Sequence, residues 1–210
     1  SGCRKEASEP APTAEDAPRM TAADPAAAPA ALPSPPFDAR LFAAGTLSFL
    51  LTGGLAAVYG LGLPAWSRDF GLGAGEGGLL LAAHGAGALL TVAAGVGGLP
   101  VVALRTGLAL LAAGSALLGL APSWGFALVG AVLSGTGFGM TVQVVNRRFL
   151  KDFGTRGPGM VGLVNAVFGG GAILGPFVVL MAGGRPGPVL LGAAALLALA
   201  AALAPPDPPR

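Results

Sequence analysis

Cysteine, histidine and charged residues are all scarce in this sequence. One cysteine, Cys3, and one histidine, His84, occur among 210 residues, and only 10% of the residues are charged. A lone cysteine excludes an intramolecular disulfide and a metal site built from several cysteines. The low charge excludes an ordinary water-soluble domain, in which about a quarter of the residues are charged. No basic run or basic patch with interleaved aromatic residues is present, so nucleic acid is not an expected partner.

Groups for enzyme chemistry are also missing. The uncharged stretches hold no Ser/His/Asp arrangement, no paired carboxylates and no cluster of metal ligands. They hold no single carboxylate either, and a buried ionisable group is the usual sign of ion coupling in a membrane. We therefore expect no catalytic residue, metal or cofactor. Proton coupling would have to use His84 or a partner outside this chain.

Apolar residues make up 53% of the chain, and 36 of its residues are glycine. Small residues of this kind allow helices to pack closely inside a bilayer. The uncharged stretches are residues 41–67, 77–104, 106–146, 157–184 and 186–206. Each is long enough to cross a membrane, because about 20 apolar residues span the hydrocarbon core.

The longest uncharged stretch has room for two crossings. Pro122 and Trp124 lie near its middle, and Ala121–Trp124 is typical of a turn at the membrane surface. A second break is expected near Gly97–Pro100. The predicted spans are 41–63, 77–98, 100–121, 124–146, 159–182 and 187–204. The fold class is thus an all-α membrane protein with six transmembrane helices.

The basic residues predict the orientation, since Lys and Arg near helix ends remain in the cytoplasm. With both termini inside, the cytoplasmic basic residues are Arg40, Arg105, Arg147, Arg148, Lys151, Arg156 and Arg210. Only Arg68 and Arg185 lie outside. This asymmetry predicts a multi-pass protein with cytoplasmic N- and C-termini.

The two ends of the chain differ from its middle. Residues 1–38 are rich in proline, alanine and mixed charge, a composition that cannot bury enough apolar surface to fold. We expect a disordered cytoplasmic tail at 1–38, a helical bundle at 39–204 and a short cytoplasmic tail at 205–210. The chain begins with Ser rather than Met, and Met20 is one alternative start.

Two halves of the bundle repeat one another. Residues 78–90 align without gaps on residues 162–174, an offset of 84. Arg68-Asp-Phe-Gly71 returns as Lys151-Asp-Phe-Gly154, at an offset of 83, and Thr52-Gly53 returns as Thr136-Gly137. Three spans followed by three related spans would cross in opposite directions, which is the inverted repeat of secondary transporters. Shared Gly/Ala/Leu composition is the alternative explanation.

With these features the chain resembles the N-terminal half of a major facilitator superfamily (MFS) transporter over residues 38–204. Gly62-Leu-Pro64 ends the first span, Phe70-Gly-Leu72 precedes the second and Ala121-Pro-Ser123 follows the third. Gly135-Thr-Gly-Phe-Gly139 with Asn146, and Gly171-Ala-Ile-Leu-Gly-Pro176, complete the likeness. The last resembles the Gly-x-x-x-Gly-Pro motif of exporters in that superfamily. The resemblance implies that the first and fourth helices line a central cavity and that the third and sixth face outward.

Two family features are absent. The loop between the second and third spans, Gly95–Gly107, has Arg105 but none of the acidic residues of the usual gate motif. The arginine common in the fourth helix of proton-driven members is replaced by Ser134 and Gly135. The familiar gating and proton coupling are therefore not expected here.

Polar side chains inside the spans are the candidates for a solute pathway. Ser48, Thr52 and Tyr59 share one face of the first span, while Thr136 and Gln143 form a matching stripe on the fourth. His84, Asn146 and Asn165 add single polar groups. Each of these residues either contacts solute or makes an interhelical or backbone hydrogen bond. Gly135 with Gly139, and Gly171 with Gly175 and Pro176, are expected to serve helix packing.

These patterns predict a transporter that moves a small solute by alternating access in a bacterial inner membrane. Six spans form only one bundle, and rocking around a midplane site needs two. The chain would then dimerise, pair with another half or be a truncated product, and a pure monomer in liposomes would show no flux. The alternative is a transport-inactive membrane scaffold or degenerate half-transporter. Substrate, direction and coupling ion are not encoded in any recognisable motif.

Overall fold

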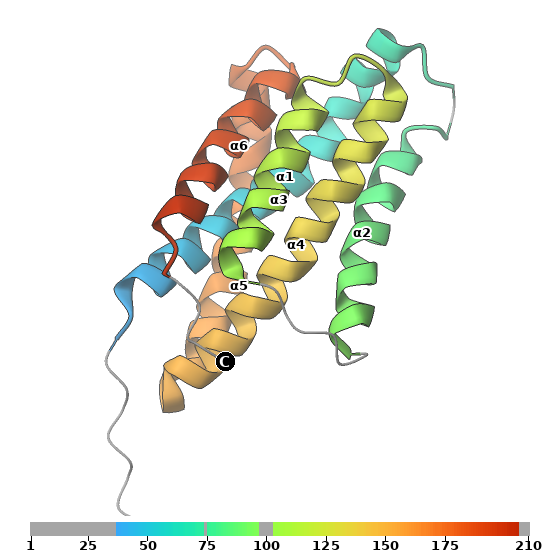
Figure 1. Cartoon of the computed structure of the whole chain (residues 1–210). Helices are drawn as coiled ribbons and strands as arrows, with labels where there is room; N and C mark the ends of the chain where they lie inside the picture. The colour runs from blue at the N-terminus through green and yellow to red at the C-terminus, as the bar shows by residue number, and fades with distance from the viewer. Residues whose placement is uncertain (1–36, 74, 97–102, 206–210) are drawn as a thin grey trace, which may run out of the picture. The chain divides into compact units, whose positions relative to one another are not determined.

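The structure, a computed structural model, describes residues 37–73, 75–96 and 103–205. Every regular element in these ranges is helical (Figure 1). The α-helices are α1(Ala39–Phe70), α2(Gly78–Val96), α3(Leu104–Gly119), α4(Trp124–Asp152), α5(Gly157–Met181) and α6(Pro186–Leu203). A 3₁₀ turn, η2(Gly154–Arg156), precedes α5. Cys3, Met20, Gly97–Pro100 and Arg210 lie outside the described residues, as does nearly all of the predicted tail 1–38.

Five of the described helices are long and apolar enough to cross a membrane, namely α1, α2, α4, α5 and α6. This supports a multi-pass membrane protein. Helix α3 is apolar but has only 16 residues. At 1.5 Å per residue it reaches about 24 Å, which is less than the roughly 30 Å hydrocarbon core. The third predicted span, 100–121, is therefore described only as a shorter helix.

Local chemistry explains where several helices begin and end. The Asp38 carboxylate accepts a hydrogen bond from the Leu41 N–H at 2.9 Å, which caps the start of α1. Gly71 ends α1 with a φ of 64°, a conformation that glycine adopts without strain. The predicted turn at Ala121–Trp124 is confirmed, because α3 ends at Gly119 and α4 begins at Trp124.

Helix α1 extends further than its predicted span. It continues through Pro64 to Phe70, whereas the span predicted from the sequence stops at residue 63. A proline inside a helix leaves the carbonyl four residues earlier without its N–H partner. That carbonyl belongs to Gly60, which is exposed and has open space around it, so the surroundings tolerate the interruption.

The helices pack in two groups that are joined by α3 and α6. Helix α1 packs against α5 and α6, while α4 packs against α2 and α3. Helices α3 and α6 also pack against each other, and α1 touches α4. The centre of the bundle is filled mainly by side chains from α1, α3 and α4. Its largest fully buried members include Val58, Tyr59, Leu108, Leu111, Val144 and Phe149.

Glycines set how closely these helices approach. A Cβ atom at Gly53 would collide with the Phe168 carbonyl oxygen of α5, and one at Gly171 would collide with that of Leu50 in α1. In the other group, a Cβ at Gly135 would collide with the His84 carbonyl oxygen and one at Gly87 with that of Val132. Only glycine permits such contact between backbones.

The predicted packing glycines lie in these same crossings. Gly139 is placed against Ala88 of α2, and Gly175 lies against the Gly54 carbonyl of α1, 2.8 Å from where its Cβ would be. Pro176 follows within α5 and is half-buried.

Candidate functional site

A polar cluster lies where α1, α2 and α4 meet. The Tyr59 hydroxyl of α1 is 3.0 Å from Ser134 Oγ of α4 and 3.3 Å from His84 Nδ1 of α2. Tyr59 is 1% exposed and Ser134 is fully enclosed, whereas His84 is half-buried. One hydroxyl therefore links three helices through side-chain hydrogen bonds.

The close crossing of α2 and α4 creates this cluster. Gly135 touches the His84 backbone, so its neighbour Ser134 is brought beside the imidazole. A larger residue at position 135 would separate the two helices. Thus the same contact that packs the bundle also positions two of the three polar side chains.

Aromatic rings extend the cluster across the bundle. The Tyr59 and His84 ring centroids are 5.1 Å apart, and those of His84 and Phe138 are 5.7 Å apart. Phe138 continues to Phe168 of α5 at 6.4 Å. These separations are typical of favourable ring contacts. The row therefore joins α1, α2, α4 and α5.

A cavity of about 200 Å³ lies along this row. Its lining residues are Thr52, Leu55, Ala56, Tyr59, Leu81, His84, Leu111, Phe138 and Phe168. None of them is charged, and the polar groups are confined to Thr52, Tyr59 and His84. A cavity of this composition surrounds an apolar body while offering hydrogen bonds on one side.

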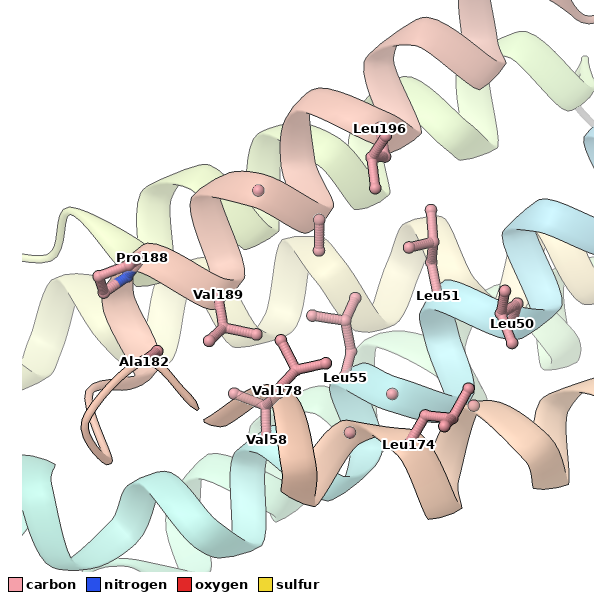
Figure 2. A pocket seen from close by; sticks show the side chains of 15 residues that line it. Leu50, Leu51, Leu55, Val58, Leu174, Val178, Ala182, Pro188, Val189 and Leu196 are labelled. Atoms are coloured by element: carbon pink, nitrogen blue, oxygen red, sulfur yellow. The ribbon is translucent and has the colours of Figure 1, made fainter. Parts of the chain in front are cut away.

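Two other hollows have different chemistry. Figure 2 shows a groove of about 460 Å³ between α1, α5 and α6, into which Leu55, Val178 and Leu196 project. All of its lining residues are apolar, so it has no side chain that could orient a polar solute. The third hollow, of about 470 Å³, contains Arg40 and Arg105 beside the end of α6. The cavity at Tyr59 is the smallest of the three but has the most specific hydrogen-bonding groups.

The predicted stripe on α1 is only partly used. Thr52 and Tyr59 both line the cavity, and Ser48 is fully buried away from it. The Ser48 hydroxyl donates to the Gly45 carbonyl at 2.7 Å, and the Thr52 hydroxyl donates to the Ser48 carbonyl at 2.8 Å. Both hydroxyls thus satisfy themselves within their own helix.

The other predicted polar residues lie apart from the cavity. Thr136, Gln143 and Asn165 each donate to the carbonyl four residues earlier on the same helix. Thr136 contributes to no cavity wall, and Asn165 is exposed. The Asn146 amide oxygen is enclosed and has no hydrogen-bond partner among the described residues.

Sequence reasoning did not select Ser134, Phe138 or Phe168 as site residues. Ser134 had been noted only because it replaces the usual arginine. The two phenylalanines looked like ordinary apolar residues. A signal for Ser134 is its place directly before Gly135, in a motif already singled out for packing.

Charged groups gather at one end of the bundle. Arg148 Nε donates to Asp152 at 3.2 Å, and Arg148 Nη2 lies 4.0 Å from Asp38. Arg105 Nε donates to the Ala204 carbonyl at 2.9 Å. These contacts place the starts of α1 and α3 at the same end as the termini of α4 and α6.

Comparison with known proteins gives no assignment. No family model, curated protein or solved structure matches the chain. Among the described residues, no three His, Cys, Asp or Glu side chains form a group able to hold a metal ion. The site is therefore interpreted from its own geometry.

Proposed function

We propose that the chain is an MFS-like membrane transporter, or half of one, that moves a small solute by alternating access. Its six helices form two triplets of opposite direction, α1–α3 and α4–α6. The observation that carries this proposal is a reciprocal pair of glycine crossings. One joins α1 to α5 and the other joins α4 to α2.

The two crossings exchange when one triplet is superimposed on the other. Gly53 meets the Phe168 carbonyl, and Gly135, 82 residues later, meets that of His84, 84 residues before Phe168. Gly171 meets the Leu50 carbonyl, and Gly87 meets that of Val132, with the same two offsets. One residue register thus accounts for all four contacts. Shared composition alone does not explain why long-range contacts keep this register.

The helix ends agree with this repeat. Gly71 follows α1 with a φ of 64°, and Gly154 follows α4 with a φ of 53°. These are the glycines of the repeated Asp-Phe-Gly sequence. The third helices also correspond, because α3 packs on α4 as α6 packs on α1. An inverted repeat exchanges these two pairs and leaves the α3–α6 contact in place.

The charged end of the bundle supports an orientation. Arg40, Arg105 and Arg148 lie there, whereas Arg68 and Arg185 flank the turns at the opposite helix ends. By the positive-inside rule the arginine-rich end is cytoplasmic. The host membrane is the bacterial inner membrane, in keeping with the dominance of Ala, Gly, Pro and Arg in the sequence.

A second bundle completes the transporter. Helices α2 and α5 expose long apolar faces, but α5 also exposes Asn165 and α4 carries Thr136 nearby. Polar groups in a membrane usually face a protein interior or a water-filled space rather than lipid. The partner that covers them is a second copy of this chain or a separate C-terminal half.

Accessibility of the cavity from both sides of the membrane tests the proposal without knowledge of the solute. In a Cys3→Ser background, Ala56→Cys places a thiol on the cavity wall. We expect a membrane-impermeant maleimide to label it in right-side-out vesicles and also in inverted vesicles. Thr155→Cys, between α4 and α5, should react only in inverted vesicles, and Glu76→Cys only in right-side-out vesicles.

The outcomes separate the proposal from its alternative. Labelling of Ala56→Cys from one side only favours a transport-inactive membrane scaffold. Labelling of Thr155→Cys from outside contradicts the inverted repeat, because the connection between the triplets would then be on the wrong side. Crosslinking of exposed α2 and α5 positions in intact membranes would identify a homodimer.

A further inference from the structure

The hydrogen-bond chain at Tyr59 determines which nitrogen of His84 carries a proton. Ser134 is fully enclosed, and its hydroxyl makes no other hydrogen bond among the described residues. If Tyr59 donated to Ser134, the Ser134 proton would be left without an acceptor. An enclosed donor without a partner is costly. The satisfied arrangement has Ser134 donating to Tyr59 and Tyr59 donating to His84 Nδ1.

This arrangement leaves one hydrogen-bond donor unused. A neutral imidazole that accepts at Nδ1 carries its proton on Nε2. No partner for Nε2 occurs in the part of the chain that the structure describes, and Nε2 is not among the fully enclosed polar atoms. Since His84 lines the cavity, the ring offers an N–H group to whatever enters.

We propose that the cavity bounded by Tyr59, His84, Phe138 and Phe168 binds a small, uncharged aromatic molecule that carries a hydrogen-bond-accepting oxygen. The inference rests on the proposed transport function and names the class of solute. The oxygen accepts from His84 Nε2–H. The ring of the ligand lies along Phe138 and Phe168, where offset and edge-on ring contacts are available.

Size and charge narrow the class further. A volume of about 200 Å³ is below the range of about 300–1,000 Å³ of drug-sized pockets. No lining side chain is charged, so an ionised ligand would lose its hydration without gaining a counter-ion. A single-ring ketone, aldehyde or ester meets these limits, whereas a carboxylate of the same size does not.

The sequence supplies its own reporters, because it has one histidine and one tyrosine. We would label the full chain with ¹⁵N-histidine and ¹³Cζ-tyrosine, reconstitute it in nanodiscs and record NMR spectra. The ligand-free protein should have its proton on His84 Nε2, and Tyr59→Phe should abolish this tautomer preference. A proton found on Nδ1 in the unsubstituted protein would overturn the inference.

Binding is then measured with three ring compounds of similar size. Acetophenone supplies an accepting oxygen, ethylbenzene lacks it and benzoate is ionised. Acetophenone should shift the His84 Nε2 signal saturably and bind about threefold or more tightly than ethylbenzene, the effect of one hydrogen bond in a membrane protein. Equal affinity for the two neutral compounds, or tighter binding of benzoate, contradicts the proposal.

A matched pair of substitutions on α5 controls for partition of the compounds into lipid. Phe168→Ala should weaken acetophenone binding, because Phe168 lines the cavity. Phe177→Ala should not, since Phe177 is exposed elsewhere on the same helix. Similar losses in both variants would mean that the compound binds at the lipid boundary, which also overturns the inference.

This experiment fails independently of the accessibility test. Two-sided labelling of Ala56→Cys without acetophenone binding refutes the ligand class and leaves transport intact. Saturable binding with one-sided labelling refutes alternating access and leaves a ligand-binding membrane protein.

Discussion

Helices α1 and α4 differ from α2 and α5 in how much of each is enclosed. In its most apolar window, half of α1 and half of α4 is buried, against 11% for α2 and 22% for the segment that contains α5. The well-buried helices nevertheless carry the enclosed hydroxyls Tyr59 and Ser134, while α2 and α5 expose residues such as Leu89 and Met181. In lipid an exposed leucine carries no penalty, but an exposed hydroxyl without a partner does. Burial in this bundle therefore follows polarity and close packing more than apolar content.

The largest expected effect tests whether α5 has one packed face and one open face. A Cβ at Gly171 collides with α1 backbone, whereas one at its neighbour Gly170 meets nothing within 4 Å. Gly171→Val should destabilise the protein by about 3 kcal/mol or more, the upper range for an overpacked core. Gly170→Val should change stability by less than about 0.5 kcal/mol, as surface substitutions do. Thermal unfolding in detergent measures both.

The same experiment on α2 sharpens the comparison between the two crossings. Gly87 collides with α4 backbone and Gly85 is open. Gly87→Val and Gly85→Val should therefore differ as the α5 pair does. A large effect at Gly171 with none at Gly87 would mean that the two crossings are not equivalent.

A smaller effect is expected from Tyr59→Phe, which tests the polar part of the core. The substitution removes the hydroxyl that joins Ser134 to His84, leaving an enclosed serine donor without a partner. We expect a loss of about 1–2 kcal/mol, between a typical membrane hydrogen bond and an unsatisfied buried group. Thr136→Val is the control, because that hydroxyl bonds only within its own helix, and it should be near neutral. Equal losses in the two variants would show that the Tyr59 cluster contributes nothing specific.

The helices could be predicted from the sequence because charged residues do not enter the hydrocarbon core. Arg68 and Asp69 fall in the last turn of α1, and Arg185 comes directly before α6. Charge gaps do not determine where a helix stops outside the lipid, however. For this reason α4 continues to Asp152, six residues beyond the predicted span, through a charged segment that remains helical in water.

The site could be predicted only in part. Tyr59, His84 and Thr52 stand out as polar residues in apolar segments, and all three line the cavity. Their partner Ser134 depends on where α2 crosses α4, which is a contact between residues far apart in the chain. The repeat offset of 84 pointed to Thr136 as the match of Thr52, but the crossings relate α1 to α4 with an offset of 82. That register makes Ser134 the counterpart of Thr52, and a difference of two residues turns a side chain to another face of a helix.

The smallest effect concerns the end of α4, where two adjacent arginines differ in their surroundings. The Arg148 side chain is 12% exposed and contacts Asp152 and Asp38, whereas Arg147 is exposed. Arg148→Gln should cost about 1 kcal/mol, the upper end for ion pairs accessible to water, and Arg147→Gln should cost less than half of that. Because salt screens such pairs, the difference in unfolding temperature should shrink between low and high ionic strength. A difference that persists in high salt would mean that Arg148 stabilises the junction of α1 and α4 through packing of its aliphatic stem, so that even the charged end of α4 follows the rule of close contact seen in the core.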